Sequence, residues 1–199
     1  MTIVIIIITS LVSILAFSQH DIMSRLQFNA YQVVHRKEYF RVFTHAFLHA
    51  NWEHLIINMI VLWSFGTAVE HYYYMYFGSN GMIFYLVLYF GAIFFSSLGG
   101  LIKQKNNYYY NAVGASGAVS AVVFSAIFFA PWNKIYFFGL LPIPGVVFAV
   151  LYLVYSYQMS KKNVDNVGHD AHFLGAIFGF ILPIIIRPSL FIDFINNLF

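Results

Sequence analysis

The chain has 199 residues, of which 61% are hydrophobic and only 9% are charged, and it contains no cysteine. A soluble domain is about half apolar and about a quarter charged, so this composition excludes a soluble fold and indicates a membrane protein. The net charge of +3 is small and scattered, which argues against nucleic-acid binding. The lack of cysteine excludes disulfides, a thiol nucleophile and thiolate-bound metal.

Six apolar stretches are long enough to cross a bilayer as helices. No Lys or Arg precedes the first of them, so we predict a retained span and not a signal peptide. A long polar loop over 19–50 separates the first two stretches. The sequence therefore predicts an all-α fold, a polytopic six-helix membrane bundle that forms a single domain over 1–199. The predicted spans are about 2–18, 52–71, 82–102, 113–130, 144–159 and 168–186.

Lys and Arg are distributed unevenly between the two sides of this bundle. The connections after the first, third and fifth spans hold eight of them, whereas the opposite side holds only Lys134 and Arg187. The positive-inside rule then places both termini outside the cytoplasm.

Ser116 lies at the start of the fourth predicted span, within Gly114-Ala115-Ser116-Gly117. A serine in such a helix commonly bonds back to a carbonyl one turn earlier or lets helices approach closely. At a helix N-terminus, however, unpaired N–H groups and a partial positive charge could hold a developing oxyanion. Ser116 is therefore a candidate nucleophile, with simple packing as the alternative.

His172 lies near the start of the sixth predicted span and is followed by Gly175 and Gly179. The two glycines are four residues apart and form a stripe that lets this helix pack closely on a neighbour. If the neighbour is the fourth span, His172 reaches the Ser116 hydroxyl, and a serine with a histidine base is the minimum for acyl transfer. Asp170 points to a different helix face, so we predict a dyad.

His54 and Asn58 share one face of the second predicted span. Both side chains can donate hydrogen bonds, so together with the Ser116 N–H they could form an oxyanion hole, or alternatively a polar clamp between helices. Histidine pairs at His45/His49 and His169/His172 have a spacing that zinc sites use, but no His-Glu-x-x-His motif is present. We therefore predict no metal and no cofactor.

Taken in order, these motifs resemble those of the rhomboid family of intramembrane serine proteases, from about residue 40 to about residue 180. Each motif alone is weak, but their order is highly specific. The segment Phe40–His45 resembles the family's first-loop signature, and the end of the second span resembles its Gly-x-x-x-Glu. The other matching pieces are His45, His49, His54 and Asn58, then Gly114–Gly117, and finally Ala171-His172-Phe173-Leu174-Gly175 with Gly179.

The resemblance implies a six-helix core with a water-filled cavity that opens to the extracytoplasmic side of the cell (inner) membrane. It implies Ser116 as nucleophile and His172 as general base. It also implies His54, Asn58 and the Ser116 N–H as oxyanion donors, with His49 shaping the site from nearby. The implied substrates are single-span membrane proteins in the lipid bilayer, and the oligomeric state stays open.

Two positions depart from the family pattern. Phe40 replaces the tryptophan of the Trp-Arg pair, and Ser120 stands where many members have an aromatic that packs on the histidine. The membrane orientation that the family implies is also opposite to the one that the count of Lys and Arg gives. We adopt the orientation of the family. Two alternatives remain: a non-catalytic rhomboid-like protein that binds or chaperones membrane helices, and a transporter or proton relay that uses His54, Asn58 and His172.

Overall fold

The computed structural model describes residues 1–137, 139–162 and 168–199 and is mostly helical. Its longer helices are α1 (Thr2–Ser18), α5 (Trp52–Phe77), α6 (Gly81–Gln104), α7 (Ser116–Phe129), α8 (Gly145–Lys162), α9 (His169–Ile186) and α10 (Leu190–Leu198). Its shorter elements are α2 (His20–Leu26), α3 (Ala30–His35), α4 (Arg41–Thr44), η1 (His45–Phe47), η2 (Gly78–Asn80), β1 (Lys134–Phe137) and β2 (Leu141–Pro144).

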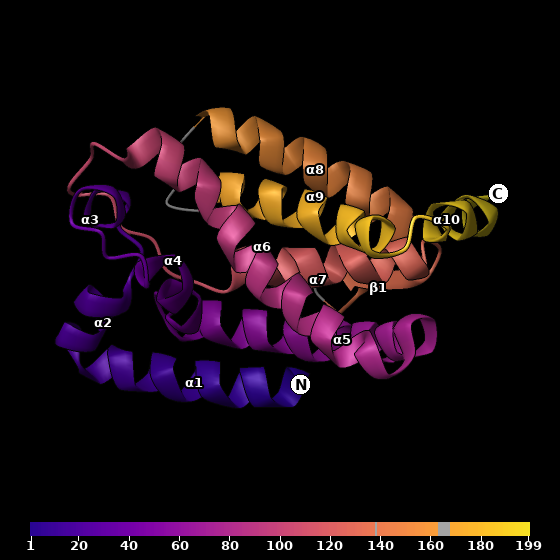
Figure 1. The fold of residues 1–199 in the computed structure, drawn as a ribbon, viewed down its shortest axis with the longest axis horizontal. Coiled ribbons are helices and arrows are strands. Elements are labelled where there is room, and N and C mark those ends of the chain that lie inside the picture. The colour runs from indigo at the N-terminus through magenta and orange to yellow at the C-terminus, as the bar shows by residue number, and fades with distance from the viewer. Residues whose placement is uncertain (138, 163–167) are drawn as a thin grey trace.

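Helices α1, α5, α6, α7, α8 and α9 run along the long axis of the molecule and alternate in direction, with α6 crossing obliquely in front (Figure 1). A helix is present at each of the six predicted stretches. By length and composition, the described residues hold two segments apolar enough to cross a membrane, Trp52–Gln104 and His169–Ile186. The first segment contains both α5 and α6, while α1 and α7 are apolar but shorter.

Helix α7 is the centre of the bundle. Every residue from Gly117 to Phe129 is buried, and α5, α6 and α9 all pack against this helix. Its sequence is apolar around the whole circumference, which is the pattern of a helix enclosed on all sides. The N-terminal residue Ser116 is only half-buried, so the helix leads from the packed core to a more accessible end.

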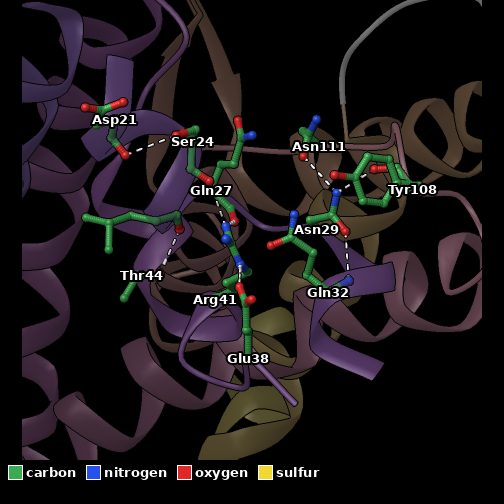
Figure 2. Close-up of polar contacts among 11 residues, drawn as sticks. Asp21, Ser24, Gln27, Asn29, Gln32, Glu38, Arg41, Thr44, Tyr108 and Asn111 are labelled. Carbon is green, nitrogen blue, oxygen red and sulfur yellow. Dashed lines mark hydrogen bonds and ion pairs between the residues drawn. The ribbon is translucent and has the colours of Figure 1, made fainter. Parts of the chain in front are cut away.

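The predicted first loop is built from α2, α3, α4 and η1 and is held by buried polar side chains (Figure 2). Arg41 is buried, and its guanidinium donates to the Glu38 carboxylate at 2.6 Å and to the carbonyls of Ser24 and Gln27. Asn29 caps α3 and donates to the Tyr108 carbonyl at 2.8 Å. These bonds satisfy backbone groups that have no helical partner, so the loop is an ordered platform.

The described residues are mostly helical, as predicted, and include one short strand pair. Strands β1 and β2 form an antiparallel pair with Lys134 opposite Pro144, directly before α8. The predicted fifth span began at 144, but residues 141–144, with prolines at 142 and 144, pair in β2, where the edge of a sheet tolerates proline. Helix α8 begins one residue later, at Gly145.

Candidate active site

Ser116 is the first residue of α7 and follows a tightly specified turn. Gly114 has a φ of +125°, and a Cβ at this position would lie 2.7 Å from the His54 ring. The Gly114 N–H donates to the His45 carbonyl at 3.0 Å, which ties the turn to the first loop. The first N–H groups of α7, including that of Ser116, have no intrahelical partner, and no side chain caps this end of the helix.

His172 meets Ser116 across the α7–α9 interface. Its Nε2 lies 2.7 Å from the Ser116 Oγ, which is hydrogen-bond distance. The glycine stripe of α9 makes this approach possible, because a Cβ at Gly175 would lie 2.1 Å from the Gly117 carbonyl oxygen and one at Gly179 would lie 2.0 Å from that of Ala121. The neighbour on which this stripe packs is therefore α7, the helix at the fourth predicted span.

Asp170 faces α6, away from the Ser116–His172 pair. Its Oδ2 lies 2.6 Å from the Lys103 ammonium in the last turn of α6. An acid in the first turn of α9 and a base in the last turn of α6 both complement the helix dipoles. The ion pair therefore fixes the end of α9 that carries the histidine.

His54 and Asn58 lie on α5 beside the serine turn. The Asn51 side chain caps α5 by accepting from the His54 N–H at 2.8 Å, and the His54 ring contacts Gly114, two residues before Ser116. Asn58 is buried, and one of its two amide hydrogens goes to the His54 carbonyl at 2.8 Å. The second amide hydrogen remains available for another acceptor.

His49 is fully buried behind His54, and the two ring centroids are 4.9 Å apart. Its partner is Ser13 of α1, which the sequence reasoning missed. Ser13 donates its only proton to the Phe47 carbonyl at 2.8 Å, so the His49 Nδ1–H must donate to the Ser13 Oγ at 2.9 Å. The signal was a polar face on α1, because Thr2, Thr9 and Ser13 are buried and lie on one side of that helix.

Replacing Ser13 by valine is expected to leave the buried His49 N–H without an acceptor and to destabilise the protein by about 1–3 kcal/mol. Thermal unfolding in detergent measures this effect. Ser10→Val is the matched control on α1, and an equal loss in that variant would contradict a specific role for Ser13.

His45 and His49, whose spacing is one that zinc sites use, do not lie side by side on a helix. The 3₁₀ turn η1 ends at Phe47 and Leu48 is extended, so the two rings do not share a helix face. His45 instead donates through Nδ1 to the Arg41 carbonyl at 3.0 Å and packs on Phe28. Within residues 1–137, 139–162 and 168–199, no three His, Asp or Glu side chains gather as a metal site requires.

These two loop histidines predict a pH-dependent stability. Burial lowers the pKa of His45 to about 4 and, with a smaller effect of the nearby His54, lowers the pKa of His49 to about 3. Each histidine then takes up its proton only on unfolding, so its full stabilisation holds above the unfolded pKa near 6.5 and is lost as the pH falls toward the folded value.

At pH 5 we expect this loss to be about 2 kcal/mol for each of the two histidines. Thermal unfolding in detergent between pH 7.5 and 4.5 measures it. His45→Asn keeps a donor for the Arg41 carbonyl but does not titrate, so its stability should fall less steeply with acid. An identical pH slope in that variant would contradict the assignment.

Comparison with known proteins shows the family of this chain. The family model described as "Rhomboid domain" matches residues 36–189, so the chain belongs to the rhomboid family and is a membrane protein. It is 30% identical over 141 residues to "Rhomboid protease GluP" of Bacillus subtilis (strain 168), covering 71% of this chain and 25% of that protein. It is 27% identical over 158 residues to "RHOMBOID-like protein 12, mitochondrial" of Arabidopsis thaliana, covering 74% of this chain and 46% of that protein. The chain thus matches less than half the length of either relative.

Proposed function

We propose that this rhomboid-family chain is an intramembrane serine endopeptidase in which Ser116 is the nucleophile and His172 the general base. The observation that carries the proposal is the 2.7 Å contact between the Ser116 Oγ and the His172 Nε2 at the uncapped N-terminus of α7. A serine within reach of an imidazole, beside unpaired backbone N–H groups, has the parts that acyl transfer needs.

The chemistry follows from the positions of these atoms. With Nε2 unprotonated, the Ser116 hydroxyl donates to it, and His172 removes that proton as Oγ attacks the substrate carbonyl. The resulting oxyanion is stabilised by the Ser116 N–H, the His54 ring and the second Asn58 amide hydrogen, while His49 supports the His54 ring from behind. The imidazolium protonates the leaving amine. Water, activated by the same histidine, then releases the acyl group from Ser116.

The proposed membrane arrangement is a single six-helix domain over 1–199, in which α1, α5, α6, α7, α8 and α9 cross the cell membrane. The N-terminal ends of α7 and α9 then lie on the same side as the first loop, so the site opens toward the extracytoplasmic face. Substrates are single-span membrane proteins whose helix unwinds to present an extended peptide to Ser116. No cofactor takes part.

A fluorescent fluorophosphonate probe tests the proposal on the detergent-purified protein. We expect the wild-type protein to be labelled, and we expect Ser116→Ala and His172→Ala to lose both labelling and cleavage of a reconstituted single-span substrate while remaining folded. If the folded wild type is not labelled, the chain is a non-catalytic scaffold that binds membrane helices, and Ser116 is a packing residue. Protease access to tags on each terminus tests the orientation, and termini outside the cytoplasm would contradict it.

A further inference from the structure

A tyrosine from a third helix covers the imidazole of the candidate base. The Tyr152 ring of α8 stacks on the His172 ring with a centroid distance of 6.4 Å and an interplanar angle of 28°. Its hydroxyl lies 2.6 Å from the Ser120 Oγ of α7. Tyr152 therefore contacts both of the helices that carry Ser116 and His172, and it joins them to α8.

The direction of the hydrogen bonds in this cluster is determined by the number of protons. The Ser120 hydroxyl donates its single proton to the Ser116 carbonyl at 2.8 Å. Ser120 can then act only as an acceptor toward the tyrosine, so the Tyr152 O–H donates to it. The chain of contacts runs from Tyr152 through Ser120 to the backbone of Ser116, while the face of the same ring lies on His172.

Helix α8 lies at the edge of the bundle and is mostly exposed or half-buried. Of its 18 residues only Gly145 and Ser156 are buried. Its inner face is an aromatic row in which Phe148 stacks on Tyr152 at 5.6 Å, and the Tyr152 ring also contacts Phe124 of α7 at 5.6 Å. Few buried contacts make an element easy to displace. Tyr152 is one of the residues that hold α8 against α9, together with Tyr155 and Tyr157.

We propose that Tyr152 is a positioning residue for His172, so that the catalytic base engages Ser116 only while α8 is seated against α7 and α9. This inference rests on the proposed protease function. The Tyr152 ring restricts rotation of the His172 imidazole about its side-chain bonds. The hydrogen bond from the Tyr152 hydroxyl to Ser120 holds the tyrosine ring in this position. Asp170, the acid nearest to His172 in sequence, is bound to Lys103 on α6. Displacement of α8 removes the Tyr152 ring from the imidazole of His172.

The test separates the ring from its hydroxyl. Tyr152→Leu removes the stack and is expected to lower kcat and the rate of probe labelling about 10- to 100-fold with little change in KM, because a misplaced base loses catalysis and not substrate binding. Tyr152→Phe keeps the stack and should retain activity within about fivefold. Ser120→Ala should give the same small loss as Tyr152→Phe, and the double variant no more, since both remove one hydrogen bond.

Tyr157→Leu is the matched control, because Tyr157 lies on the same helix and its ring contacts Phe173 of α9 at 5.9 Å. We expect this variant to keep wild-type kcat. The inference is overturned if Tyr152→Leu retains wild-type kcat, if its loss lies in KM alone, or if Tyr157→Leu loses as much activity.

A readout that needs no activity keeps this inference separate from the protease proposal. In the Ser116→Ala background, the imidazole proton resonances of His172 should carry a ring-current shift that disappears in Tyr152→Leu and persists in Tyr152→Phe. If the wild-type protein fails to react with the probe while this pattern holds, the protease proposal fails and the positioning contact stands. Identical His172 resonances with Tyr152, with Tyr152→Leu and with Tyr152→Phe would overturn the contact itself.

Discussion

Replacing Gly175 by alanine is expected to reduce cleavage and probe labelling by about 100-fold or more. The added methyl carbon would lie 2.1 Å from the Gly117 carbonyl oxygen, whereas a carbon and a carbonyl oxygen in contact are about 3.3–3.6 Å apart. Helix α9 must therefore move away from α7 by about 1 Å. The Ser116–His172 hydrogen bond of 2.7 Å then exceeds hydrogen-bond distance, and a misplacement of this size costs about 100-fold in rate.

Gly168→Ala is the matched control for that substitution. Gly168 directly precedes α9, and a methyl group there meets its nearest neighbour, the Ala171 Cβ, at an ordinary 3.6 Å. We expect near wild-type labelling in this variant. Circular dichroism and size-exclusion chromatography report whether Gly175→Ala stays folded, and a folded protein with full activity would show that the glycine stripe does not set the position of the base.

The position of the helices could be predicted because it depends on local patterns, whereas the contact between Ser116 and His172, 56 positions apart, was expected from the order of the motifs that resemble the rhomboid family. Continuous apolar runs specify where helices form. The i, i+4 glycines of α9 specify which face of that helix approaches another backbone, and His172 lies one turn earlier on the same helix. The ends of helices were less predictable. Helix α5 continues to Phe77, past the predicted end at 71, because a helix can extend beyond the apolar stretch that reveals it.

The supporting contacts could not be predicted because they join segments far apart in the chain. Ser13 and His49 are separated by 36 positions, and Ser120 and Tyr152 by 32. No periodicity in the sequence indicates which helix faces will meet. The missing aromatic at Ser120 illustrates this limit, because the replacement ring comes from α8 and its hydroxyl bonds to the very serine that replaced the aromatic.

The ordered structure of the first loop could not be predicted from the sequence either. Its composition predicts a polar connection, but its order depends on Arg41, whose three bonds reach back to Glu38, Ser24 and Gln27. The consequence for the site is direct. The bridge between Phe28 and Ala112 and the bond from the Gly114 N–H to the His45 carbonyl connect this loop to the turn that presents Ser116.

Removing the side-chain donors of α5 is expected to produce the second large loss of activity. We expect His54→Ala and Asn58→Ala each to lower kcat by about 100- to 1,000-fold with a small change in KM, because an oxyanion donor acts on the charge that develops only in the transition state. Probe labelling should fall in parallel, since phosphonylation of Ser116 also develops a negative oxygen.

The two variants should differ in stability, and this difference separates catalysis from packing. Asn58 is buried and donates to the His54 carbonyl at 2.8 Å, so its loss is expected to lower the free energy of unfolding by about 1 kcal/mol. The side chain of His54 is only half-buried and lies beside Gly114, so its loss is expected to change stability less. Trp63→Ala is the control on α5, because Trp63 is 59% exposed on that helix. If these residues were only a polar clamp between helices, their loss would lower the free energy of unfolding while the kcat of the folded fraction stayed normal. A loss of kcat in a His54→Ala protein that melts like the wild type, and in the folded fraction of Asn58→Ala, supports their role as donors to the oxyanion.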